Sequence, residues 1–181
     1  MQKNWYAVYT KPRCEKKVAS LFTKRKIENF FPVNFRRIKS FRHIKILREP
    51  LFKSYVFVNT TLAEIDLLKQ VSGVISILYW RGEPAVIKQD EIDAIKEFTR
   101  YYRYIELDRA DVNIHDVARV VDSPSYSIKG NAFAVKNKTL KVSLPSLGYI
   151  MIAKIEDGNF FGSEVSYKAN RLRIHNETGH R

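Results

Sequence analysis

The segment 51–58 constrains the fold more than any other, because it is a predicted strand with large apolar side chains on both faces. Side chains of a strand alternate between the two faces of a sheet. One face, which we expect to be core, holds Phe52, Val56 and Val58. The other face holds Tyr55 and Phe57, although one face of an antiparallel sheet commonly meets water. Either a helix covers this second face, or Tyr55 and Phe57 form an exposed patch for a partner.

The elements around this strand predict an α+β sandwich. Aromatic and β-branched residues mark the strands, Pro12 can open a helix, and apolar residues recur at helical spacing in three places. The expected elements are strands at 5–10, 74–80 and 84–87, a hairpin within 35–48, and helices at 13–27, 62–70 and from Gln89 or Asp90. An antiparallel sheet with flanking helices accounts for this order.

The chain changes character near residue 106, where an acidic stretch loses the helical period. Beyond it, short predicted strands recur about every ten residues, which is typical of a small β-barrel. These strands are expected at 117–121, 132–135, 139–144 and 149–155, with one more at 164–167 in a polar tail. The expected organisation is an N-terminal domain at 1–105, a linker at 106–114, a barrel domain at 115–156 and a C-terminal tail at 157–181.

Positive charge is concentrated in the first third of the chain. The formal net charge is +13, and residues 1–58 hold 15 Lys and Arg against three acids. A basic face directed at phosphate groups explains this asymmetry, so the favoured partner is a nucleic acid. A soluble basic surface without a dedicated partner is the alternative.

Two basic elements carry much of this charge. On a helical wheel of about 100° per residue, Arg13, Lys17 and Lys24 fall within about 40° of one another, beside the apolar face of the first helix. The segment 35–48 has seven basic residues, counting His43, and no acid, so it predicts a basic β-hairpin. A solvated helix flank and an irregular charged loop are the alternatives for these two elements.

Catalytic and metal chemistry find no support in the sequence. One cysteine excludes an intramolecular disulfide and a cysteine zinc site, and the four histidines lack metal-ligand spacing. No glycine-rich phosphate loop or nucleophile elbow occurs. No apolar run approaches the roughly 18 residues of a membrane span, and the N-terminus has no signal-peptide apolar region. We expect a cytoplasmic protein that is not an enzyme, needs no metal or cofactor, and has no membrane partner.

Segments in both halves of the chain resemble proteins of the NusG family, and they occur in that family's order. The first half resembles the NusG N-terminal domain at 5–12, 50–58, Gly73, Gly82 and 84–87. The second half resembles a KOW module, which is an SH3-like β-barrel, at 116–120, Ser123-Pro124, Gly130 and 144–148. The details are most similar to the specialised RfaH-type and UpxY-type antiterminators of polysaccharide operons.

The resemblance implies a transcription elongation and antitermination factor that binds the clamp helices of RNA polymerase. Such a factor promotes processive elongation and suppresses pausing or termination, here on long operons of the polysaccharide type. The clamp-binding cavity of the family maps onto Tyr9, Tyr55 and Phe57. Basic residues that RfaH-type proteins present to the non-template DNA strand map onto Lys11, Lys17 and Lys24. With the hairpin included, the residues expected to contact non-template DNA or nascent RNA are Lys11, Arg13, Lys17, Lys24, Arg36, Arg37 and Arg42.

The second domain is implied to bind a ribosomal protein or the termination factor Rho, and a monomer is expected. RfaH-type second domains can refold as a helical hairpin that masks the clamp site, but the β-branched strands here favour the barrel. The loop before Gly73 also lacks the His-Thr-Thr run with which RfaH reaches the opposite side of the polymerase cleft. The alternative function is a KOW-containing nucleic-acid or ribosome-binding module without polymerase contact.

Overall fold

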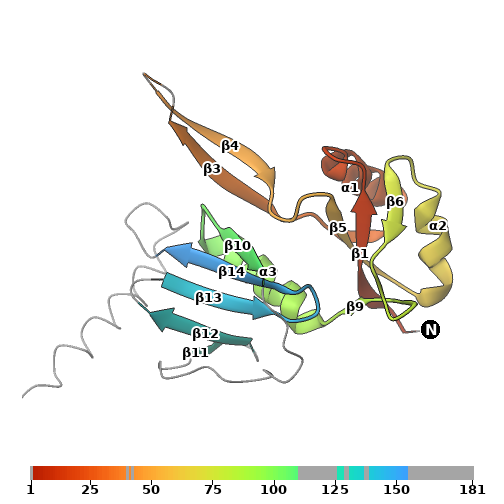
Figure 1. The fold of residues 1–181 in the computed structure, drawn as a ribbon. Coiled ribbons are helices and arrows are strands. Elements are labelled where there is room, and N and C mark those ends of the chain that lie inside the picture. Colours follow the sequence, from red (N-terminus) through yellow and green to blue (C-terminus); the bar gives the residue numbers. More distant parts are fainter. Residues whose placement is uncertain are drawn as a thin grey trace, which may run out of the picture.

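The computed structural model describes residues 2–39, 41, 43–109, 126–128, 131–136 and 139–154. Within these residues lie two five-stranded antiparallel sheets and two separate two-stranded hairpins (Figure 1). Helix α3 (Gln89–Tyr101) lies between the two sheets (Figure 1). No helix in this described part of the chain is long and apolar enough to cross a membrane.

The first sheet is centred on β1 (Asn4–Thr10), which forms the strand expected at 5–10. Its order is β2-β5-β1-β6, and β9 also pairs with β1. The other strands are β2 (Glu28–Phe30), β5 (Tyr55–Thr60), β6 (Val74–Ile77) and β9 (Val86–Ile87). The short hairpin of β7 (Tyr79–Trp80) and β8 (Glu83–Pro84) lies between β6 and β9 in the chain.

The strand expected at 51–58 begins only at Tyr55, so this part of the sequence prediction is wrong. Residues 51–54 form a turn in which Ser54 has a left-handed backbone, with φ of 63°. This turn breaks the alternation of side chains before the strand starts. As a result, Phe52 does not share a core with Val56 and Val58 but belongs to the apolar cluster that contains Phe57.

Helices cover both faces of the first sheet. On one face, α1 (Glu15–Lys24) and α2 (Ile65–Lys69, after the 3-10 turn Leu62–Glu64) pack against the strands. That cluster includes Val8, Val18, Phe22, Val56, Val58 and Leu68. The cluster of the other face includes Trp5, Ala7, Phe57, Ile92, Ile95 and Phe98, of which the last three come from α3. The α/β sandwich expected from the sequence is therefore present in the first 105 residues.

The second sheet has the order β10-β14-β13-β12-β11 and is antiparallel throughout. Its strands are β10 (Glu106–Arg109), β11 (Tyr126–Ile128), β12 (Asn131–Lys136), β13 (Thr139–Leu144) and β14 (Tyr149–Lys154). The last three match strands expected from the sequence, whereas β10 takes up the start of the expected linker and β11 was not anticipated. The strands expected at 117–121 and 164–167 and the tail lie outside the described residues, so the closed barrel and the domain boundaries stay predictions.

The second sheet packs against the first domain through the α3 side. Five residues of β13 and β14 share the apolar cluster with α3 and Phe57, namely Leu140, Val142, Leu144, Met151 and Ala153. At the edge of this contact, the Tyr149 ring meets the Phe52 ring edge-on, with centroids 5.8 Å apart. A contact built from this much apolar surface favours a docked arrangement of the two parts.

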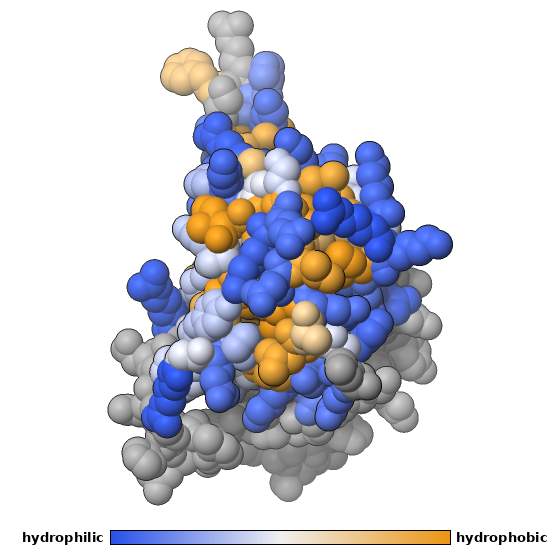
Figure 2. Space-filling view, turned by 90° about the vertical axis from the view of Figure 1, so that its right-hand side faces the viewer, coloured by the Kyte–Doolittle hydropathy of each residue, from blue (hydrophilic) through white to orange (hydrophobic). Residues whose placement is uncertain are grey.

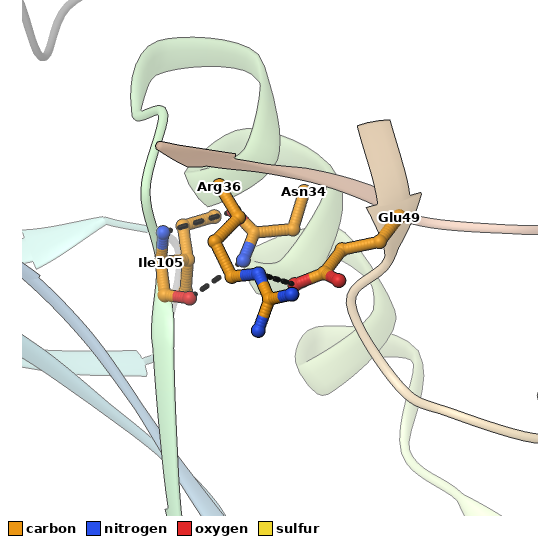
Figure 3. Close-up of polar contacts among 4 residues, drawn as sticks. All are labelled: Asn34, Arg36, Glu49 and Ile105. Atoms are coloured by element: carbon orange, nitrogen blue, oxygen red, sulfur yellow. Dashed lines mark hydrogen bonds and ion pairs between the residues drawn. The ribbon is translucent and has the colours of Figure 1, made fainter. Parts of the chain in front are cut away.

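Asn34 fixes the base of the long hairpin to the end of the first domain (Figure 3). The hairpin consists of β3 (Val33–Lys39) and β4 (Ile44–Pro50). The buried Asn34 amide donates to the Ile105 carbonyl at 2.7 Å, and its Oδ1 accepts from the Ile105 N–H at 2.9 Å. The single side chain therefore satisfies both backbone groups of a residue 71 positions away.

Replacing Asn34 by leucine should lower the free energy of unfolding by about 2–4 kcal/mol. The Ile105 N–H and C=O would be buried without partners, and each such group costs about 1–3 kcal/mol. Urea unfolding followed by circular dichroism measures this loss. Asn59→Leu is the matched control, because Asn59 makes an exposed hydrogen bond to Glu28 and should change stability by no more than about 0.5 kcal/mol. Equal losses in both variants would contradict the assigned role of Asn34.

Candidate functional site

Tyr9 and Tyr55 form an aromatic pair at one end of the first sheet. The register of β1 and β5 places them directly opposite each other, and their ring centroids lie 5.5 Å apart with planes tilted by 51°. Tyr9 is 37% exposed and Tyr55 is half-buried. Of the three aromatic residues expected to form a binding surface, these two lie together at the surface.

Phe57 does not share that exposure. It is fully buried, packed edge-on against Phe52 with ring centroids 5.4 Å apart and stacked on Phe30 at 6.3 Å. The expectation of an exposed patch is therefore wrong for Phe57, which follows the covered-core alternative. The reason is tertiary: α3 and the second sheet supply the apolar cluster in which Phe57 lies.

A pocket of about 310 Å³ opens beside Tyr55, at the contact between the first domain and the second sheet. Its lining includes Phe52, Lys53 and Tyr55 from the first domain and Tyr149 from β14. Burial raises the pKa of Tyr55, and the neighbouring phenols of Tyr149 and Tyr9 raise it further. The Tyr55 hydroxyl therefore stays protonated at neutral pH and remains able to donate a hydrogen bond.

Glu15 sets the backbone that leads into Tyr55. Its side chain is buried at the start of α1, and its Oε1 accepts a hydrogen bond from the Ser54 N–H at 2.7 Å. A left-handed backbone is unfavourable for a residue with a side chain, so Ser54 needs such support. Sequence reasoning missed Glu15, which stands alone among cations. Its place in the first turn of a predicted helix, where a carboxylate is favoured, was the available signal.

The cations expected on the first helix are all exposed. These are Lys11, Arg13, Lys17 and Lys24. Arg13 has φ of 64°, so α1 begins after it, and its expected position on the helical wheel is wrong. Lys17 and Lys24 remain on one side of α1, seven residues apart. The backbone N–H of Lys11 donates to the Gly73 carbonyl at 2.8 Å, which fixes the turn before the helix.

The cations expected on the hairpin differ in their surroundings. Arg36 Nε lies 3.6 Å from a carboxylate oxygen of Glu49 (Figure 3), and the Arg37 guanidinium lies 4.3 Å from the centroid of the Tyr104 ring. Both side chains are exposed, so a phosphate could reach them. Arg42 lies outside the described residues. The structure thus confirms the hairpin, with Arg36 and Arg37 exposed on β3.

Glu91 lies where α3 meets the turn between β13 and β14. Its Oε1 accepts from the Ser146 N–H at 3.1 Å and from the Ser146 hydroxyl at 2.7 Å. Its Oε2 is buried and has no hydrogen-bond partner among the described residues. Burial raises the pKa of Glu91 above its ordinary value of 4.5, although the two bonds from Ser146 act in the opposite direction.

The raised pKa of Glu91 predicts a pH-dependent contribution to the stability of the docked arrangement. Protonation is easier in the docked state, so this contribution is fully present below pH 4.5 and is lost as the pH rises through the raised pKa. The melting temperature of the wild type should therefore rise relative to that of Glu91→Gln as the pH is lowered from 8 to 5, because glutamine does not titrate. A difference in melting temperature between the two proteins that is the same at both pH values would contradict this assignment.

The described residues contain no group of three or more His, Cys, Asp or Glu that could hold a metal ion. The surface instead offers aromatic rings beside a contact between domains, and cations on a helix and a hairpin. These are features for recognising macromolecules.

The chain is similar to known proteins over most of its length. The sequence model of the family described as "Transcription termination factor nusG" matches residues 3–96, which is more than half of the chain. A search of curated proteins finds no match. A solved structure, "Domain interaction in Thermotoga maritima NusG", is 21% identical, with 86% of this chain and 99% of that chain covered and a TM-score of 0.48. The MjSpt4:Spt5 complex in conformation A is 16% identical, with 83% and 99% covered and a TM-score of 0.30.

Proposed function

The chain belongs to the NusG family of transcription factors, and on that premise we propose that it binds the clamp helices of RNA polymerase and promotes processive elongation. The observation that carries the proposal is the pairing of Tyr9 with Tyr55 at the accessible end of the first sheet. Large aromatic side chains at a partly desolvated surface are the residues that most often dominate protein binding energy. A partner helix that packs its apolar face against Tyr9 and Tyr55 would be bound mainly through these two rings, which act as anchors.

The basic residues are proposed to hold the non-template DNA strand, with nascent RNA as the other candidate ligand. Lys17 and Lys24 lie along one side of α1, and Lys11 and Arg13 precede it. A flexible single strand is bound mainly through charge, with weak dependence on its sequence. Arg36, Arg37 and Arg42 of the hairpin complete the proposed set.

The docked second sheet is proposed to limit access of the clamp helices. Tyr149 lies against Phe52 and lines the same pocket as Tyr55, while Phe57 lies within the contact itself. Clamp helices that reach Phe57 would have to displace the second sheet, whereas Tyr9 is exposed while the sheet is docked. The released second domain is the proposed partner of a ribosomal protein or of Rho. Control of long polysaccharide-type operons is the proposed biological setting, with the chain acting as a monomer.

Co-elution with bacterial core RNA polymerase in size-exclusion chromatography tests the proposal. We expect a stoichiometric complex at moderate salt, and longer transcripts with fewer pauses in elongation assays on long templates. Binding that disappears entirely as salt rises, with no effect on elongation, would overturn it.

Burial of Phe57 supports a second candidate, a nucleic-acid or ribosome-binding module without polymerase contact. In that case the aromatic face serves only the docking of the second sheet, and the concentrated charge of residues 1–58 is the functional surface. This candidate predicts tight binding to free RNA or DNA with a steep loss of affinity as salt rises.

A further inference from the structure

We infer that the hairpin of β3 and β4 is a DNA-bending arm that inserts Phe41 between base pairs of duplex DNA through the minor groove. The inference rests on the proposed function only for its ligand, DNA, and it does not require polymerase. The proposed function assigned only nucleic-acid contacts to the arginines of this hairpin. The inference adds that the target is duplex DNA, that Phe41 is the wedge residue and that the DNA is bent.

The hairpin is built as a projecting arm. Its two strands pair with each other over seven positions, from Val33 opposite Pro50 to Lys39 opposite Ile44, and join neither five-stranded sheet. Seven residues at about 3.3 Å each give a ribbon of about 23 Å. Figure 1 and Figure 2 show this ribbon extending away from the body of the protein.

The free end of the arm carries exposed apolar side chains. Phe41 at the tip is fully exposed, and Ile44 and Ile46 behind it are 64% and 50% exposed. Single exposed apolar side chains are common, but three gathered at the end of a solvated ribbon indicate a surface that is covered by a partner. An aromatic ring at the tip has the flat shape needed to enter a base stack.

Cations flank these apolar side chains on the same faces of the ribbon. Residues directly opposite in an antiparallel pair share a face, so Lys39 lies beside Ile44 and Arg37 beside Ile46. On the other face, Lys45 lies beside Ile38. The segment 35–48 contains no acid, and Glu49, the nearest one, is paired with Arg36 at the base. The partner must therefore be anionic along the arm and apolar where the tip enters it.

Duplex DNA meets both requirements. Proteins that bind the minor groove place basic residues along it and insert apolar wedges, including phenylalanine, between base steps. Two-stranded ribbons are among the elements that read DNA grooves. Wedge insertion unstacks a step and kinks the duplex by about 20–90°, which opens the groove to more of the ribbon.

The base of the arm is held firmly enough to act as a lever. Asn34 makes two buried hydrogen bonds to Ile105, and Arg37 lies over the Tyr104 ring (Figure 3 shows the Asn34 contacts). These contacts attach the ribbon to Tyr104 and Ile105, in the short segment between α3 and β10. A force applied at the tip is thereby transmitted to the body of the protein.

Energy transfer between dyes at the two ends of a 30-base-pair duplex with a central TA step tests the inference, using the full chain without polymerase. Pyrimidine–purine steps kink most easily, so the wild type should increase the transfer. Phe41→Ala should abolish the increase while weakening binding less than about tenfold, because the phosphate contacts remain. Phe41→Trp should retain bending. Leu67→Ala, at another exposed apolar residue, should behave as the wild type.

The proposed phosphate contacts are tested separately, by the salt dependence of DNA affinity. Lys39→Gln with Lys45→Gln should reduce the slope of log affinity against log salt by about 2, since each phosphate contact contributes about 0.9. Absence of bending by the wild type, or equal bending by Phe41→Ala, would overturn the inference. So would loss of binding to anionic lipid vesicles, or loss of polymerase co-elution, in Phe41→Ala with no change in DNA bending. Polymerase co-elution of the wild type is scored separately, so the proposed function can fail while this inference stands.

Discussion

Replacement of Tyr9 and Tyr55 together by alanine is expected to weaken binding to core RNA polymerase by about 100-fold or more without unfolding the protein. The two rings contact each other at the accessible end of the first sheet, where a partner helix could cover both. Aromatic anchors of this kind cost about 2 kcal/mol or more each when truncated at an interface. The affinity can be measured by fluorescence anisotropy of the labelled protein against polymerase, with circular dichroism to show that the fold is retained.

Leu62→Ala with Leu67→Ala is the matched control for the tyrosine pair. Both leucines are exposed, at 64% and 56%, and lie in the α2 region rather than beside the aromatic pair. Their loss removes a similar amount of apolar surface and should leave polymerase affinity within about twofold of the wild type. If the leucine variant loses as much affinity as the tyrosine variant, or if the tyrosine variant binds normally, the assignment of the clamp contact to Tyr9 and Tyr55 is wrong.

Phe57→Ala is expected to lower the free energy of unfolding by about 3–5 kcal/mol. The side chain is fully buried between Phe30 and Phe52 and in the cluster shared with α3, so its removal leaves a cavity. Chemical denaturation in the absence of polymerase measures the loss. The result distinguishes the two interpretations of this face, because an exposed Phe57 would cost less than about 1 kcal/mol.

Polymerase binding by Phe57→Ala provides a second test of the burial of Phe57. A loss of affinity in Phe57→Ala has to be measured at a temperature at which the variant is fully folded, since unfolding alone would mimic it. An unchanged stability together with lost polymerase binding would contradict the docked arrangement described here. It would support a state in which the second sheet has left the aromatic face.

The sandwich of the first domain could be predicted from the sequence because each of its helices and strands is marked by a pattern of neighbouring residues. The periods of two and 3.6 residues, with Pro12 before α1, place most helices and strands near their observed positions. The start of β5 and the start of α1 could not be placed in this way. Ser54 and Arg13 both adopt left-handed backbones, and no composition or period identifies such residues when they are not glycine.

The candidate site was predictable in part for a different reason. The aromatic side chain of Tyr55 and the concentration of cations follow from strand alternation and charge in the sequence, whereas Tyr9 is assigned through the resemblance to the NusG family. The burial of Phe57, the bonds from Asn34 to Ile105 and the bonds from Ser146 to Glu91 join residues far apart in the chain. Such contacts depend on how the second sheet packs on α3, and strand patterns alone do not specify that packing.

Site-specific photocrosslinking from position 9 tests the central claim most directly. A photoreactive phenylalanine analogue in place of Tyr9, which is 37% exposed, keeps the ring and probes its nearest neighbour in the complex with core polymerase. The account predicts a crosslink to the clamp helices of the polymerase, and none to those helices from the same analogue at Leu67. A crosslink from position 9 that maps to another part of the polymerase, or only to the second sheet of the protein itself, would contradict it.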